Sequence, residues 1–256
     1  MNALATSSAV LAVVLAGAAL GAILRRVLPP THMSEDSKDV VKLGIGVIAT
    51  LAALVLGLLI ASAKGSFDTK SEEIKESAAR IIVLDRTLRQ YGPETVPIRE
   101  TLRSAVLSKV NLHWVEGTGM PDAEALGNAT SEVSSIERMQ QMLWMLAPTS
   151  ELQRALRARA VQLSAELSQM RWMLLEQKGS SIALPFVVVL VFWLAVIFGS
   201  FGLFAPPNAT VYSVIFICAL SVSSAIFLIL ELDRPFDGLL MIPDAPLRSA
   251  IGELSR

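Results

Sequence analysis

Two long apolar runs in the last third of the chain constrain the fold more than any other feature. No Asp, Glu, Lys, Arg or His occurs from Ile182 to Phe204 or from Val211 to Leu230. Each run is long enough to cross a bilayer as a helix, which takes about 20 apolar residues. The prolines of the intervening Ala205-Pro206-Pro207-Asn208 predict a tight turn. We therefore predict a transmembrane hairpin over residues 181–230, with spans at about 182–204 and 211–230.

Two further apolar segments precede this hairpin, at residues 3–24 and 41–63. The first lacks a preceding basic residue and is longer than the core of a signal peptide, which favours a retained helix. Its Gly17 and Gly21 form a GxxxG pair that lets another helix approach closely. With 53% hydrophobic residues and a mean hydropathy of +0.55, the chain is predicted to be an all-α integral membrane protein with four transmembrane helices.

Residues 65–180 are hydrophilic and helically periodic, which predicts a helical domain inserted between the second and third spans. We expect a first helix that carries an Asp85–Arg89 pair off its apolar face and stops at Gly92-Pro93. A second helix is expected from about Pro93 or Thr95 to Glu116, then a loop at 117–127, a third helix at about 130–146, and a fourth that Thr149 or Ser150 caps. Residues 1–64 form the first hairpin, and 231–256 a C-terminal tail.

The fourth of these helices has apolar residues at alternating spacings of four and three, which is typical of a coiled coil or a helix bundle. One interpretation is a seam within a four-helix bundle, and the other is that copies of this helix meet in an oligomer. Its arginines lie off the seam, on a face that is solvated or attracts anions. The seam consists of Leu152, Leu156, Ala160, Leu163, Leu167, Met170 and Leu174, and the arginines are Arg154, Arg157 and Arg159.

Small residues recur every four positions along the second span, as Ala49, Ala53, Gly57 and Ala61. Such a stripe is a surface for close helix packing. It either packs against another helix of the same subunit, or it lines a subunit interface or a narrow pore. We take Ala53, Gly57 and Ala61 as pore candidates.

Charged residues appear abruptly where the fourth span ends, in Glu231-Leu232-Asp233-Arg234. They either form an interfacial ion-pair cluster that ends the helix or, repeated around an oligomer axis, a charged ring at a pore mouth. Glu231, Asp233 and Arg234 are therefore pore or gate candidates. In the same span, Ser221 and Ser224 either bond back to their own helix or line the pore.

The remaining composition excludes several classes of function. The net charge of −1 gives the chain no general attraction to nucleic acid. The single cysteine, Cys218, rules out a disulfide framework. No nucleotide-binding, hydrolase or metal-ligand motif is present, so we expect no enzyme activity, no cofactor and no metal site.

Basic residues near the membrane ends favour an inside location for both termini and the helical domain. Arg25 and Arg26 lie on the opposite side and argue against this orientation. The residues that favour it are Lys64, Lys70, Lys75, Arg171, Lys178, Arg234 and Arg248.

Several stretches resemble a bacterial membrane family described as bestrophin-like and of unknown function. They are LDRTLRQYGPE (84–94), RWMLLEQ (171–177), LPFVVVLVFWL (184–194), FGLFAPPNAT (201–210), AIFLILELDRPFDGL (225–239) and APLR (245–248). A more distant resemblance is to bestrophins, four-span oligomeric anion channels with an acidic-Pro-Phe segment after the last span, to which Asp233-Arg234-Pro235-Phe236 is similar. The aromatic constriction of bestrophins has no counterpart in the aliphatic stretch from Leu51 to Ile60.

The resemblance implies an oligomeric ion channel in the inner membrane of a bacterium, with the lipid bilayer and other copies of the chain as partners and inorganic ions as cargo. The distribution of basic residues, with four spans, places both termini and the helical domain in the cytoplasm. The alternative is a membrane-anchored scaffold or signalling module whose helical domain binds a protein.

Overall fold

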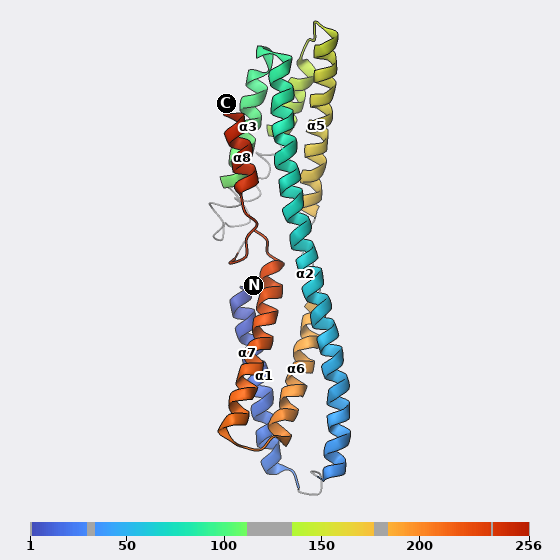
Figure 1. Ribbon diagram of the computed structural model, residues 1–256, viewed down its shortest axis with the longest axis vertical. Helices are drawn as coiled ribbons and strands as arrows, with labels where there is room; N and C mark the ends of the chain where they lie inside the picture. The colour runs from blue at the N-terminus through green and yellow to red at the C-terminus, as the bar shows by residue number, and fades with distance from the viewer. Residues whose placement is uncertain (1, 30–33, 112–134, 177–183, 237, 256) are drawn as a thin grey trace. The chain divides into compact units, whose positions relative to one another are not determined.

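A computed structural model describes residues 2–29, 34–111, 135–176, 184–236 and 238–255 (Figure 1). Every regular element in this part of the chain is helical, which confirms the all-α prediction. Residues 135–145 are helical as well. The named elements are α1 (Ala3–Val27), α2 (Glu35–Tyr91), the 3₁₀ turn η2 (Pro93–Thr95), α3 (Val96–Val110), α5 (Glu151–Glu176), α6 (Leu184–Phe204), α7 (Ala209–Leu232) and α8 (Ala245–Leu254).

The chain divides into two compact units, the first comprising Met1–Ser66 and Ser180–Arg234. It contains α1, α6, α7 and the first part of α2. These four helices are long and apolar enough to cross a membrane, as predicted. Their buried side chains form one apolar core that includes Val14, Leu190, Phe198 and Ile226.

Glycines bring α1 and α6 into close contact in this unit. A Cβ atom on Gly21 would lie 1.8 Å from the Gly199 carbonyl oxygen, and one on Gly202 would lie 1.9 Å from the Ala18 carbonyl oxygen. A Cβ on Gly17 would lie 2.6 Å from the carbonyl oxygen of Ala195. The GxxxG prediction is therefore confirmed, since only glycine allows the two backbones to approach this closely.

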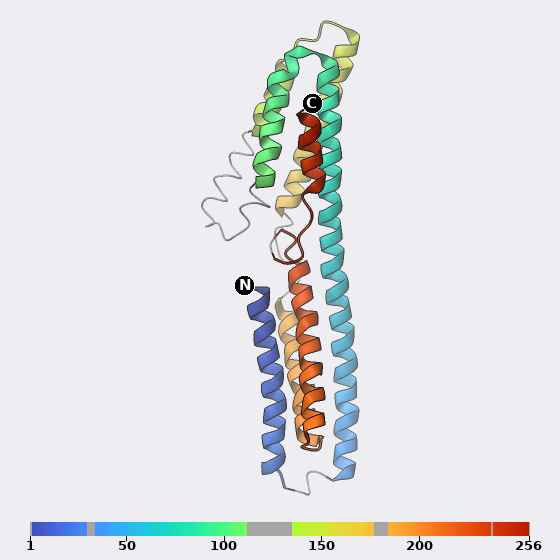
Figure 2. The same ribbon diagram turned by 60° about the vertical axis from the view of Figure 1, so that its left-hand side comes forward.

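Figure 2 shows α1 and α6 running in one direction and α7 in the other, and polar contacts link these helices at both ends of the first unit. The Arg25 guanidinium, at the end of α1, donates to the Ala205 carbonyl in the α6–α7 turn. In the same turn, the Asn208 side chain accepts from the Val211 N–H at 2.8 Å and caps α7. At the other end, the Ser223 hydroxyl of α7 donates to the Ser7 carbonyl of α1 at 2.6 Å. These contacts agree with the directions of the three helices.

The second unit comprises Phe67–Gly179 and Pro235–Arg256. It contains the later part of α2, with α3, the helix at 135–145, α5 and α8. Its buried apolar core includes Leu84, Leu102, Leu143, Leu163 and Leu247. The residues that follow the fourth span are thus not a separate tail from Pro235 onward, because α8 buries Leu247, Ala250 and Leu254 in this unit.

The helix α2 is continuous over 57 residues, so the prediction of a new helix after Lys64 is wrong. The charged residues that follow Lys64 end the apolar run, but they do not end the helix. Gly65 costs a helix only about 1 kcal/mol, and no proline interrupts the backbone. The predicted stop at Gly92 is confirmed, because Gly92 adopts φ 138°, a conformation that favours glycine.

The predicted boundaries in the rest of the second unit are confirmed in part. Ser150 caps α5 by accepting from the Gln153 N–H at 3.1 Å. The α5 seam is buried at Ala160 and Leu163, whereas Leu152 is 67% exposed. The predicted loop at 117–127 and the end of the second helix lie outside the described residues.

Candidate functional site

The small-residue face of α2 is uncovered in the subunit. Ala53, Gly57 and Ala61 are exposed, whereas Ala52 and Leu59 are buried in the core of the first unit. A Cβ atom on Gly57 would meet no other atom within 4 Å. Ala49, at the start of the stripe, is half-buried against the core of the first unit, whereas the part from Ala53 to Ala61 is open to lipid or to another subunit.

The serines of α7 divide into two kinds. The hydroxyls of the exposed Ser221 and Ser224 each donate at 2.8 Å to a carbonyl one turn earlier in their own helix, those of Ile217 and Leu220. This is the usual way in which an apolar helix accommodates serine. The buried Ser223, in contrast, links α7 to α1 through the Ser7 carbonyl. Ser221 and Ser224 can still offer oxygen lone pairs to an ion.

The charged residues at the end of α7 differ in their exposure. Glu231 is only 6% exposed, whereas Asp233 and Arg234 are half-buried. The backbone tightens here, because the Arg234 N–H donates to the Glu231 carbonyl at 3.0 Å. Of the two carboxylates, Asp233 is thus the more accessible to ions in the isolated subunit. Asp237 lies outside the described residues.

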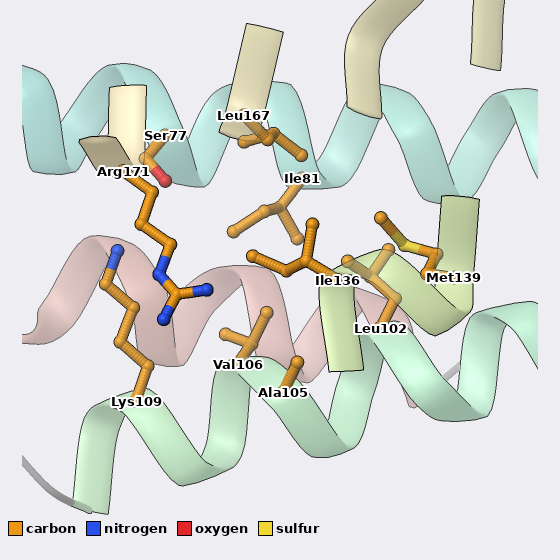
Figure 3. A pocket seen from close by; sticks show the side chains of 10 residues that line it. All are labelled: Ser77, Ile81, Leu102, Ala105, Val106, Lys109, Ile136, Met139, Leu167 and Arg171. Atoms are coloured by element: carbon orange, nitrogen blue, oxygen red, sulfur yellow. The ribbon is translucent and has the colours of Figure 1, made fainter. Parts of the chain in front are cut away.

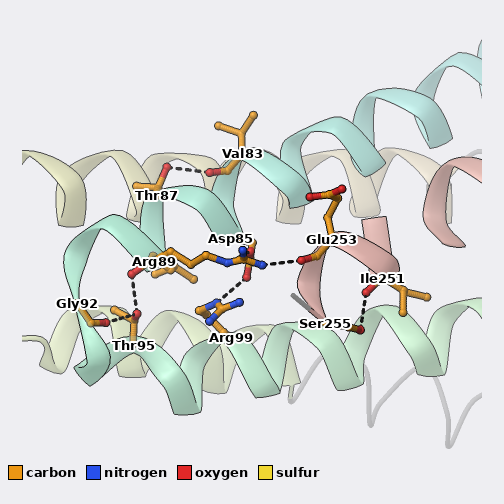
Figure 4. A network of polar contacts seen from close by, with 11 residues as sticks. Val83, Asp85, Thr87, Arg89, Gly92, Thr95, Arg99, Ile251, Glu253 and Ser255 are labelled. Atoms are coloured by element: carbon orange, nitrogen blue, oxygen red, sulfur yellow. Dashed lines mark hydrogen bonds and ion pairs between the residues drawn. The ribbon is translucent and has the colours of Figure 1, made fainter. Parts of the chain in front are cut away.

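A buried ion-pair network in the second unit was not predicted (Figure 4). Asp85 is 1% exposed, and its carboxylate accepts from the Arg89 Nε at 2.8 Å and from the Arg99 Nε at 2.7 Å. Arg89 also donates to the Glu253 carbonyl of α8 at 2.5 Å. The Asp85–Arg89 pair expected from the i,i+4 spacing is therefore confirmed, whereas its burial and its connection to Arg99 and α8 were not predicted. The position of Asp85, between the buried Leu84 and Leu88, could have indicated this burial.

The arginines of α5 are partly structural. Arg157 donates to the Leu143 and Trp144 carbonyls at 3.1 and 2.7 Å, and its guanidinium lies 5.5 Å from the Trp144 ring centroid. It therefore satisfies carbonyls at the end of the helix at 135–145, where a cation is favourable. Arg154 and Arg159 bond to neighbouring side chains of their own helix.

A further ion pair connects α2 and α5. Arg80 pairs with Glu76 of its own helix at 2.6 Å and with Glu166 of α5. The hydrogen bond to Glu76 raises the pKa of Arg80. Among the described residues, no group of three His, Cys, Asp or Glu side chains is arranged to hold a metal ion.

Comparisons with known proteins bear on the family. No curated protein and no solved structure matches the chain. One family model, described as the bestrophin-like domain, matches residues 12–247, which is nearly the whole chain and includes both α7 and the charged residues that follow it. The chain therefore belongs to the bestrophin-like domain family.

Proposed function

We propose that the protein is a subunit of an oligomeric ion channel, resembling bestrophins and conducting anions. The observation that carries this proposal is the uncovered small-residue face of α2 at Ala53, Gly57 and Ala61. Small side chains let backbones of neighbouring copies approach closely or leave space for a narrow pore. Family membership supports a channel-like role.

We place the pore between subunits. Among the described residues, the core of the first unit is formed by apolar side chains such as Val14, Leu194 and Ile226, with Ser7, Ser223 and Glu231 as its buried polar residues, which favours a path between copies over one through a single copy. We propose that copies of the chain surround an axis lined by the α2 face, with Ser221, Ser224 and the charged residues Glu231, Asp233 and Arg234 contributing along the path or at its mouth.

Conductance tests this proposal directly. Purified protein in planar bilayers should conduct, and Glu231→Gln or Asp233→Asn should change conductance or selectivity. Glu151→Gln is a matched control, because Glu151 is an exposed carboxylate of the second unit that pairs with Arg154 of its own helix. Silent bilayers from a well-folded oligomer would contradict the proposal.

We also propose that the protein lies in the inner membrane of a bacterium with both termini cytoplasmic. Because the chain has one cysteine, Cys218, a Cys218→Ser background allows single cysteines to be placed at will. In whole cells, an impermeant maleimide should label Asn208→Cys in the α6–α7 turn and spare Ser255→Cys. The reverse pattern would invert the topology.

A second candidate function is a scaffold whose second unit binds a protein. A groove of about 410 Å³ is lined by Trp144, Pro148, Arg154, Arg157, Ala158 and Val161. Met145 and Leu152, which lie close in sequence to these lining residues, are exposed, and this apolar surface favours the scaffold. Met145→Asp should then abolish the cellular activity of the protein and leave any conductance unchanged. If cellular activity is lost only in variants that also lose conductance, such as Glu231→Gln, the channel is favoured.

A further inference from the structure

Three consecutive apolar side chains are exposed in the segment that joins α7 to α8. Leu239, Leu240 and Met241, which we call the apolar tip, are 77%, 40% and 47% exposed. The core of the second unit shows the usual arrangement, in which aliphatic side chains such as Ile81 and Val106 point into the same small cavity between helices (Figure 3). A run of exposed apolar residues instead indicates a surface that meets another protein or a membrane.

The segment around the apolar tip is fixed to the second unit. The Ile242 N–H donates to the Pro235 carbonyl at 2.9 Å, which closes the chain into a loop. Pro235 is buried, and Ile242 is 1% exposed in the apolar core of the unit. Gly238 adopts φ 111°, a conformation that favours glycine, and turns the chain just before Leu239. The apolar tip is therefore held outward by a closed loop whose base is buried.

The path of the chain keeps the apolar tip close to the end of the fourth span. The uncharged run of α7 ends at Leu230, and the helix ends at Leu232. A chain extends at most about 3.6 Å per residue, so Leu239 lies within roughly 25 Å of the end of α7. The loop also returns to Pro235, shortly after Leu232, and does not lead away from the span. The headgroup layer of a bilayer is therefore within reach of the apolar tip.

We propose that the apolar tip inserts into the lipid interface beside the end of the fourth span. Interfacial segments bury their apolar side chains about 5–10 Å into the boundary between headgroups and acyl chains. A tip of three residues spans roughly 10 Å, which matches this depth. Lipid is the occupant that the position favours, because a loop so near the end of a span meets the bilayer in every copy of the chain. The proposal does not depend on ion conduction.

Quenching by nitroxide-bearing lipids tests this insertion with the full-length protein in nanodiscs. In the Cys218→Ser background, Leu240→Cys carries an environment-sensitive fluorophore. A nitroxide on the acyl chain close to the headgroup should quench this probe at least about twice as strongly as a nitroxide at the methyl end, since the tip is expected to reach only about 5–10 Å. If Leu240→Cys does not fold, Leu239→Cys replaces it.

Leu152→Cys, with the same fluorophore, is the matched control because Leu152 is an exposed leucine of the same unit. The side chain of the adjacent Gln153 donates to the Tyr91 carbonyl at 3.1 Å, which places this position at the end of α2. From Ala63, at the end of its apolar stretch, to Tyr91 the helix rises about 42 Å at 1.5 Å per residue. A probe at Leu152 should therefore escape quenching by either lipid.

Removal of the neighbouring apolar side chains distinguishes insertion of the tip from insertion of the fluorophore alone. When Leu239→Ser and Met241→Ser are added to Leu240→Cys, quenching should fall toward the level of Leu152→Cys. Equal quenching at Leu240 and Leu152, or quenching that persists in the triple variant, would overturn the proposal. Blue-shifted emission without quenching by either lipid would mean that protein, such as a second copy of the chain, covers the tip, and this result would overturn it as well.

Discussion

The charge of Asp85 is predicted to hold the second unit together, and Asp85→Asn isolates that charge because it keeps the shape of the side chain. Removing one partner of a buried ion pair typically costs about 3–5 kcal/mol, since a charge is left without compensation. Here the side chains of Arg89 and Arg99 are 34% and 22% exposed, so water partly compensates them. We therefore expect a loss of roughly 2–3 kcal/mol in the free energy of unfolding of the second unit.

Hydrogen exchange measured by mass spectrometry on the full-length protein reports this loss locally. A decrease of 2–3 kcal/mol corresponds to about 30- to 150-fold faster exchange of the amides that open with the unit. Peptides from α3 and α8 should show it, whereas peptides from α1 and α6 should not. Asp39→Asn is the matched control, because Asp39 pairs with Lys42 on the exposed surface, where such pairs contribute less than about 1 kcal/mol.

The two arginines should differ in their effect on α8. Only Arg89 bonds to the Glu253 carbonyl, so Arg89→Gln should accelerate exchange in α8 more than Arg99→Gln does. If Asp85→Asn exchanges at the rate of Asp39→Asn, or if the two arginine variants affect α8 equally, the network does not have the assigned role.

Two further predictions concern the first unit. Gly21→Ala should cost about 3 kcal/mol or more, because its Cβ would lie 1.8 Å from a carbonyl oxygen of α6 and the helices would have to separate. Gly44→Ala is the control, because a Cβ at Gly44 meets open space, and it should not lower the thermal stability measured by size-exclusion chromatography after heating. A similar loss of thermal stability in Gly21→Ala and Gly44→Ala would contradict this explanation. Ser223→Ala should cost roughly 0.6–1.7 kcal/mol by removing an interhelical hydrogen bond, whereas Ser221→Ala should be neutral. Thermal unfolding in nanodiscs distinguishes them, and equal stabilities would refute the role of Ser223.

The sequence predicts features that depend on neighbouring residues. The four apolar helices follow from run length and hydropathy, the Gly92 stop from backbone conformation, and the Ser150 cap from local hydrogen bonding. The close approach at Gly17 and Gly21 was also predictable as a kind of contact, although its partner, α6, was not. Each of these features is determined by residues that lie close together in the sequence.

Features that depend on contacts between distant segments were not predicted. The buried carboxylate of Asp85 pairs with Arg99 of α3 and with Arg89, and Arg89 also bonds to the Glu253 carbonyl of α8. The continuation of α2 past Lys64 was not predicted. In the sequence, the change from apolar to charged residues at this point looks the same whether the helix ends or only leaves the membrane. For the candidate pore residues, the sequence predicted the small-residue face of α2. Whether Gly57 is exposed depends on where the other three spans pack, and the sequence does not give that arrangement.

The close contact of α1 with α6 also has a consequence for biosynthesis. Gly21 and Gly199 are separated by most of the chain, and ribosomes add about 5–20 residues per second, so the first span waits roughly 10 to 35 s for its partner to be made. During that interval the glycine face of α1 is covered only by lipid or by other proteins. The membrane unit is therefore completed late in translation, and truncation before the third span should leave the first span as a target for quality-control proteases.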